Sequence, residues 1–153
     1  MGSGSSPSSE PRGKYEDSLR ALGRFIEPFS PSELELLECG EQFEVSWRIG
    51  AEQRTQSQTF NIQALREFSR SFRMRVGRAP GISNAELLRA IGRSLDRLKA
   101  ERLFLQQTTT GYSAVFPRAG QSVTRLNWSR RDLAALVATL QREHYPPERA
   151  QTA

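Results

Sequence analysis

The sequence predicts an α+β fold built by tandem duplication of one unit, a helix, a three-stranded antiparallel sheet and a second helix, with the two copies in a pseudo-twofold arrangement. Three observations lead to this prediction. A hexapeptide recurs after 69 residues, and apolar positions downstream of it recur at the same offset. In both halves the apolar spacing also changes from helical to alternating in the same order.

The recurring hexapeptide is LRALGR at residues 19–24 and LRAIGR at 88–93, with five identities in six positions. The same offset pairs Ile26 with Leu95, Phe29 with Leu98, Leu34 with Leu103, Leu36 with Leu105, Phe43 with Tyr112 and Trp47 with Phe116. After one deletion the offset is 68, which pairs Phe60 with Trp128, Asn61 with Ser129, Leu65 with Leu133, Phe68 with Leu136 and Phe72 with Leu140. Core positions therefore match core positions across the whole unit.

The elements of each copy follow from these spacings. Apolar residues three or four apart predict helices, and alternation of apolar with polar residues predicts strands with one buried face. The first copy is expected to have a helix over 15–29, strands over 34–36, 43–49 and 54–60, and a helix after the N-cap Asn61. The second copy is expected to have a helix after Ser83 or Asn84, strands over 103–105, 112–116 and 124–128, and a helix after the N-cap Ser129.

Five segments make up the predicted domain organisation. Residues 1–13 and 146–153 read as disordered tails, because Gly-, Ser- and Pro-rich sequence such as the first of them cannot bury enough surface to offset the entropy of ordering. Residues 14–78 and 84–145 are the two αβββα repeats, and 79–83 is the linker between them.

A glycine occupies the same place in the first helix of both repeats, at Gly23 and Gly92. Glycine inside a helix costs up to about 1 kcal/mol relative to alanine. Its recurrence indicates close backbone approach, with the two first helices crossing each other, or simple inheritance from an ancestral unit.

The chain has 153 residues and a net charge of +5, and Lys14 and Lys99 are its only lysines. Residues 14–78 contain 10 basic and 10 acidic residues, whereas residues 84–144 contain 10 and 5, so the excess positive charge lies in the second repeat. From the start of the sequence we expect no signal peptide. The sequence has no apolar run of membrane-spanning length, and its one cysteine cannot form an internal disulfide framework. We expect no membrane contact and a cytoplasmic location.

Arginines at helical spacing are the candidate nucleic-acid-binding residues, because guanidinium groups pair with phosphates. The alternative for each is a solvated face with local ion pairs, each worth a few tenths of a kcal/mol. The candidates are Arg66, Arg70 and Arg73 in one row, Arg89, Arg93 and Arg97 in another, and Arg125, Arg130 and Arg131 near the end of the second sheet.

The outer faces of the two predicted hairpins differ. The carboxylates between Glu33 and Glu44 on the first hairpin read as a solubilising face, whereas the second hairpin places Phe104 and Val115 on its outer face. Such apolar side chains need a cover. A helix of the same chain is the favoured cover, and a protein partner or a stacked base is the alternative. Phe104 and Val115 are therefore the candidate partner-binding residues.

No catalytic residue, metal site or cofactor is predicted. His144, the only histidine, is expected near the end of the last helix, where its charge suits the helix dipole. Glu38 and Glu41 flank Cys39, which should raise the thiol pKa and oppose a nucleophilic role. The segment 77–81 lacks the spacing of a phosphate-binding loop. We therefore do not expect an enzyme.

The leading hypothesis from the sequence is a non-enzymatic nucleic-acid-binding or nucleic-acid-associated protein, whose Arg-rich helix faces contact phosphates. The alternative is a protein-binding adaptor or chaperone-like module that uses the second-repeat sheet face. The expected partner is thus a nucleic acid or a protein.

Overall fold

The computed structural model describes residues 13–49, 54–70, 83–117 and 122–144. Over these ranges the chain has four α-helices and one six-stranded antiparallel sheet, which confirms the predicted α+β class. Most of the predicted tails and linker, and Arg73, lie outside the described residues. The helices are α1 (Lys14–Ile26), α2 (Ile62–Arg70), α3 (Asn84–Arg97) and α4 (Arg130–His144). The strands are β1 (Pro31–Cys39), β2 (Gln42–Ile49), β3 (Arg54–Asn61), β4 (Phe104–Gln107), β5 (Gly111–Pro117) and β6 (Val123–Ser129).

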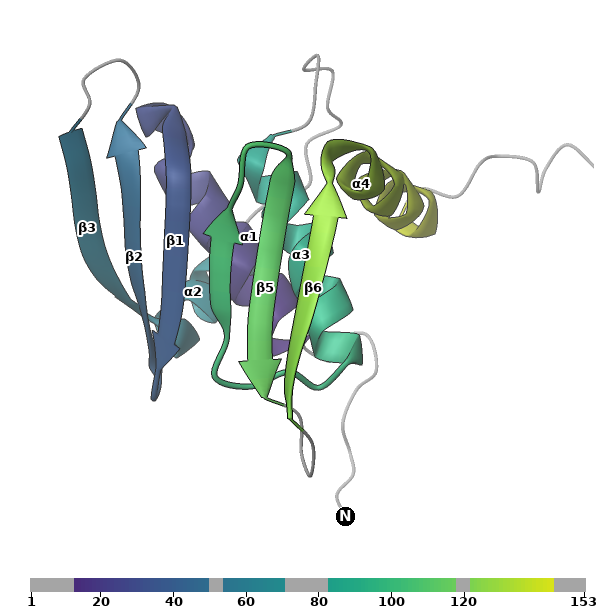
Figure 1. Ribbon diagram of the computed structural model, residues 1–153, viewed down its shortest axis with the longest axis horizontal. Coiled ribbons are helices and arrows are strands. Elements are labelled where there is room, and N and C mark those ends of the chain that lie inside the picture. The colour runs from purple at the N-terminus through teal and green to yellow at the C-terminus, as the bar shows by residue number, and fades with distance from the viewer. Residues whose placement is uncertain (1–12, 50–53, 71–82, 118–121, 145–153) are drawn as a thin grey trace, which may run out of the picture.

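Each half of the chain contributes three strands to the single sheet, whose strand order is β3-β2-β1-β4-β5-β6. β1 and β4 are the central pair, in which Leu36 lies opposite Leu105. Helices α1, α2 and α3 lie on one face of the sheet, and α4 lies beside the end of β6 (Figure 1). The order helix, three strands, helix therefore occurs twice along the chain and forms one layered body.

The hydrophobic core lies between the sheet and the helices, because alternate strand residues point toward α1 and α3. The predicted buried faces of β1, β2, β4 and β5 are confirmed, whereas β3 is buried only at Phe60 and the inward residues of β6 are half-buried. The largest fully buried side chains are Trp47, Tyr15, Phe43, Phe116, Leu19, Leu22, Ile26, Leu34, Leu36, Leu88, Ile91 and Leu95.

Three predicted helix starts are confirmed by capping hydrogen bonds. Asn61 Oδ1 accepts a backbone N–H bond of 2.8 Å at the start of α2. Ser83 and Glu86 form a reciprocal capping box at α3, with bonds of 3.2 and 3.3 Å. Ser129 and Asp132 bond each other's backbone N–H in the same way at α4. These bonds satisfy amides that have no partner within the helix.

Several boundaries differ from the prediction: most strands are longer than predicted, and β1 extends from Pro31 to Cys39 instead of over 34–36. The first helix ends at Ile26 instead of residue 29, and Glu27–Phe29 form a short 3-10 helix, labelled η3. Pro28 has no N–H to donate to the preceding turn, so the regular helix cannot continue through it. β4 begins at Phe104, one residue after the predicted strand start at Leu103.

Helices α1 and α3 cross in direct backbone contact at two glycines. A Cβ atom on Gly23 would lie 2.6 Å from the Cα of Ala85, and one on Gly92 would lie 2.8 Å from the Cα of Glu16. Both distances are shorter than real Cβ contacts, so only glycine fits at either position. This confirms the close backbone approach predicted from the recurring glycines.

Each crossing helix also caps the N-terminus of the other. The Asp96 carboxylate of α3 accepts hydrogen bonds from the backbone N–H of Tyr15 at 2.9 Å and of Glu16 at 2.8 Å. Glu27, which follows α1, accepts one from the backbone N–H of Asn84 at 3.0 Å. Burial raises the pKa of Asp96, although the two amide hydrogen bonds act in the opposite direction. A carboxylate at a helix N-terminus is stabilised by the helix dipole, so these contacts reinforce the crossing.

We expect Gly92→Ala to lower the free energy of unfolding by about 2 kcal/mol or more, because the added methyl group must push α1 away from α3. In an uncrowded helix the same change would raise that free energy by up to about 1 kcal/mol through helix propensity. Urea denaturation gives the sign directly. Gly23→Ala should act like Gly92→Ala, and Ser94→Ala in α3 is the matched control with a small effect. A stabilised Gly92→Ala protein would contradict the crossing.

Candidate interaction surfaces

The sheet face opposite α1, α2 and α3 carries a row of side chains in register across five strands. Leu37 of β1 lies opposite Phe104 of β4, and Phe104 lies opposite Val115 of β5. Beyond Leu37 the row continues to Glu44 of β2, and beyond Val115 to Arg125 of β6. Directly opposed residues of antiparallel strands share one face. We call these five residues the outer row.

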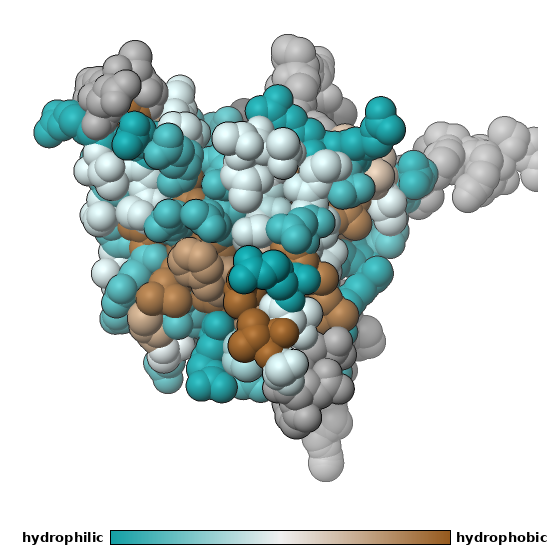
Figure 2. All heavy atoms as spheres, viewed as in Figure 1, coloured by the Kyte–Doolittle hydropathy of each residue, from teal (hydrophilic) through white to brown (hydrophobic). Residues whose placement is uncertain are grey.

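The apolar centre of the outer row is open to solvent. Leu37 is 43% exposed, and Phe104 and Val115 are half-buried. Figure 2 views this face and shows hydrophobic side chains gathered over its middle and lower part. No helix of the described ranges lies over it (Figure 1). The cover favoured from the sequence, a helix of the same chain, is therefore not found there, because α1, α2 and α3 pack on the opposite face and α4 packs against α3 and β6.

Opposite charges stand at the two ends of the outer row. Glu44 and Arg125 are exposed, and four strand spacings of about 4.8 Å place their backbones about 19 Å apart. Neither forms an ion pair with another residue in the part of the chain that the structure describes. The acidic end adjoins a shallow hollow of about 370 Å³. Its lining includes the carboxylates of Glu35 and Glu44, the side chains of Leu37 and Phe104, and the hydroxyls of Ser46, Ser57 and Thr59. This end of the row therefore combines negative charge with apolar surface.

A buried carboxylate holds β1 against β4 and so determines the register of the outer row. The backbone N–H of Glu38 donates to the Leu103 carbonyl at 2.8 Å. In return, the Leu103 N–H donates to Glu38 Oε1 at 3.0 Å. Leu37 precedes Glu38 in the chain, and Phe104 follows Leu103. The two hydrogen bonds between Glu38 and Leu103 therefore place Leu37 beside Phe104.

The Glu38 carboxylate is kept ionised by two further partners. It accepts a hydrogen bond from the Tyr15 hydroxyl and lies 2.8 Å from Lys14 Nζ. Burial alone would raise the pKa of Glu38, but the hydrogen bonds from Lys14, Tyr15 and Leu103 outweigh burial and hold that pKa below its usual value. Burial and the bond to Glu38 in turn raise the pKa of Tyr15, so its hydroxyl keeps its proton. Gln107 lies 69 positions after Glu38 and has a neutral side chain. Its Oε1 accepts a hydrogen bond from the backbone N–H of Leu34 at 3.1 Å, which is equivalent to the bond from Leu103 to Glu38.

Two of the predicted nucleic-acid-binding arginines on α3 form ion pairs with neighbouring helices. Arg89 is buried, and its Nε lies 3.0 Å from Glu16 Oε2 of α1. Arg93 forms an ion pair with Glu143 of α4. Arg89 therefore strengthens the α1–α3 crossing, and Arg93 ties α4 to α3.

The remaining helical candidates do not form a continuous cationic line. Arg66 is half-buried on α2 and lies close enough to Asp96 to affect its carboxyl electrostatically. Arg70 of α2 and Arg97 of α3 are exposed. Each predicted row therefore retains one exposed arginine on the described part of its helix.

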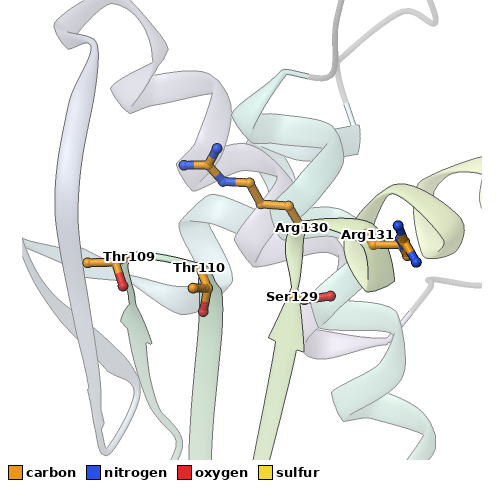
Figure 3. Close-up of a pocket in the computed structure, with 5 residues that line it drawn as sticks. All are labelled: Thr109, Thr110, Ser129, Arg130 and Arg131. Atoms are coloured by element: carbon orange, nitrogen blue, oxygen red, sulfur yellow. The ribbon is translucent and has the colours of Figure 1, made fainter.

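A second shallow hollow, of about 530 Å³, lies at the start of α4. It is lined by Arg130, Arg131, Ser129 and two residues of the β4–β5 turn, Thr109 and Thr110. The Arg130 N–H donates to the Thr110 carbonyl at 2.9 Å, which holds this turn against α4. Figure 3 shows the two exposed arginine side chains extending from the helix in different directions. The hollow therefore combines two cations with three hydroxyl groups.

Leu37 on the outer face and Glu38 on the inward face of β1 are two structurally important residues that were not predicted as site residues. Leu37 directly follows Leu36, and two successive leucines in an alternating strand must place one of them on the outer face. That signal was present in the sequence. Glu38 was assigned to the solubilising carboxylates, but it shares the inward side of β1 with Leu34 and Leu36 and is only 8% exposed. The alternation of buried and exposed residues along β1 places Glu38 on the same side as Leu34 and Leu36.

The cysteine, the potential metal ligands and the lengths of the helices bear on other classes of site. Cys39 is exposed, and its thiol pKa is raised by local desolvation and by the carboxylates of Glu44 and Glu38, in the direction expected from its acidic neighbours. No group of three or more His, Cys, Asp or Glu side chains is arranged to hold a metal ion within the described ranges. None of the helices described there is long and apolar enough to cross a membrane.

Comparisons with protein-family models, curated proteins and solved structures found no match to this chain.

We expect Glu38→Gln to lower the free energy of unfolding by about 2 kcal/mol at neutral pH, because charge-assisted hydrogen bonds become neutral ones. The folded-state pKa of Glu38 lies below the usual 4.5. Its stabilisation is therefore fully present above pH 4.5 and is lost as the pH falls through the folded-state pKa. Urea denaturation curves of the two proteins should thus converge in acid. Glu35→Gln on the exposed face is the control. A stability difference that did not shrink with acid would contradict the assigned role of Glu38.

Proposed function

We propose that the chain is a non-enzymatic protein-interaction module, an adaptor or chaperone-like unit that binds a protein through the open face of its sheet. The observation that carries this proposal is the outer row. Leu37, Phe104 and Val115 stand in register on neighbouring strands, exposed or half-buried, with no helix of the described part over them. A contiguous apolar patch with a polar rim is typical of a protein contact surface.

The charge around the patch favours a protein over a nucleic acid at this face. Glu35 and Glu44 line the hollow beside Leu37 and Phe104, and both would repel a phosphate backbone. A base-stacking platform needs cations that follow the backbone along the groove. In the outer row, Arg125 supplies a cation at one end only.

We further propose that the fold arose by tandem duplication and that its halves are related by a pseudo-twofold axis between β1 and β4. Contacts that recur at the offset of 69 support this. Gly23 meets Ala85 while Gly92 meets Glu16, and Ala85 is the residue 69 positions after Glu16. A cytoplasmic location belongs to the proposal, since a reducing compartment would keep the exposed Cys39 as a thiol.

Site-specific photocrosslinking tests the protein-binding function in the cells that make the protein. A photoreactive phenylalanine analogue at Phe104 should give covalent adducts with a protein. The matched control is the same analogue at Phe68, an aromatic residue of α2 that is 48% exposed, and it should not give those adducts.

A second variant controls for chance proximity. The photoreactive analogue placed at Val115 should yield the same adducts as the analogue at Phe104. Adding Phe104→Glu to the chain that carries the analogue at Val115 should abolish these adducts, because a buried charge without a partner opposes an apolar contact. Circular dichroism of each variant checks that the fold is retained. The absence of protein adducts at both positions in folded chains would refute the proposal.

Nucleic-acid binding remains a second candidate function, favoured by the hollow at the start of α4. There Arg130 and Arg131 are exposed beside the hydroxyls of Thr109, Thr110 and Ser129. Cations and hydroxyl groups together suit phosphate contacts that position a nucleic acid without reading its bases.

Fluorescence anisotropy with labelled single- and double-stranded oligonucleotides tests this second candidate. If it is correct, affinity should fall steeply between roughly 50 and 200 mM salt, because binding releases counterions. The double variant R130A/R131A should weaken binding at every salt concentration, whereas R142A, which removes an exposed arginine from the same helix, should not. Binding absent at the lowest salt concentration would exclude nucleic-acid contact as the function.

A further inference from the structure

We propose that the partner seated on the open sheet face is a second copy of this chain, which makes the protein a homodimer. This inference rests on the proposed protein-binding function and names its partner. It is carried by the order of chemical groups along the outer row: Glu44, Leu37, Phe104, Val115 and Arg125.

The outer row is complementary to itself when it is reversed. Two sheets stack face to face with their strands nearly aligned. A twofold axis that runs parallel to the strands and passes beside Phe104 reverses the row of the second copy over the first. Phe104 then meets its own counterpart, and Leu37 meets Val115. The exposed carboxylate of Glu44 meets the exposed guanidinium of Arg125 at both ends of the row, as expected for an isologous contact.

The shallow hollow at the acidic end strengthens this assignment. It lies where the reversed row places the Arg125 guanidinium of the second copy, and two carboxylates, those of Glu35 and Glu44, line it. Guanidinium groups prefer carboxylates beside apolar or flat surface, and Leu37 and Phe104 supply the apolar surface here. The ion pair that Glu44 and Arg125 do not make with described residues of their own chain is thus made between copies.

The size of the face indicates a moderate affinity. Six strands at about 4.8 Å spacing give a face about 24 Å wide. Strands of seven or eight residues make it about 25 Å long. A face of this size falls below the roughly 800 Å² per partner of a standard stable interface. We therefore expect a monomer–dimer equilibrium that depends on protein concentration.

A charge-swap experiment on the full chain tests the inference. Analytical ultracentrifugation should show the wild-type chain passing from monomer to dimer as its concentration rises from low micromolar to millimolar. E44R and R125E should each raise the dissociation constant by about tenfold or more, because each places like charges together at both symmetric ends. The double variant E44R/R125E should restore dimerisation.

Mixing the two single variants provides the sharper measurement. E44R and R125E together should form a heterodimer in which both ion pairs are restored, and native mass spectrometry separates it from either homodimer by mass. E67R on α2 and R142E on α4 change exposed charges on helices instead of the sheet and should dimerise like the wild type. Thermal unfolding confirms that every variant is folded.

The outcomes separate this inference from the function on which it rests. A wild-type chain that stays monomeric at millimolar concentration, or single variants that dimerise as well as the wild type, would overturn the second copy as partner. If Phe104 then still crosslinks to a different protein in cells, the protein-binding function stands with another partner. If it crosslinks to nothing, both proposals fail.

Discussion

The rest of the structure depends on the crossing of α1 and α3, where the two helix backbones touch. Gly23 and Gly92 allow that contact, since a Cβ atom at either position would enter the backbone of the other helix. Within the six-stranded sheet that the structure describes, β1 and β4 are the only neighbouring strands that come from different halves of the chain. The joining of the two halves into one sheet therefore depends on the crossing. β1 follows α1 closely in the chain and β4 follows α3, so the crossing brings the two central strands together. Glu38 and Leu103 then lock the two strands at one register.

Packing between helices, at the α1–α3 crossing and where α4 meets α3, explains why the arginine content overstates the cationic surface. Arg89 lies at the crossing and is neutralised by Glu16, and Arg93 is neutralised by Glu143 where α4 packs on α3. Both arginines contribute to the net charge but add little positive potential at the surface. Where the contacting sides of packed helices carry charged residues, these residues form ion pairs with one another. The same side chains are then not available to bind a ligand. The arginines free for a partner are those beyond the packed part of each helix, such as Arg130 and Arg131.

Local signals predicted most of the fold, and non-local contacts account for what was missed. The capping residues Asn61, Ser83 and Ser129 act within three residues of themselves, so the sequence alone located three helix starts. Strand alternation depends only on nearest neighbours and likewise predicted which side of β1, β2, β4 and β5 is buried. The cap that Asp96 provides to α1 spans about 80 residues, and no local pattern announces it. None of the four described helices covers Phe104, and this depends on where all of them lie, which no segment of sequence specifies by itself.

The open face is a consequence of topology. In each half a helix precedes and another follows three antiparallel strands, and joining the halves edge to edge places α1, α2 and α3 on the same face of a wider sheet. The other face must then be compatible with water or be covered from outside the fold. The first half meets this constraint with charge at Glu35 and Glu44, and the second half does not, because Phe104 and Val115 occupy its outer positions. Leu37 extends the apolar patch back across the central strand pair. The outer face of the first half is thus compatible with water, whereas that of the second half is apolar. Covering the apolar half from outside the fold would therefore lower the free energy of the folded protein most.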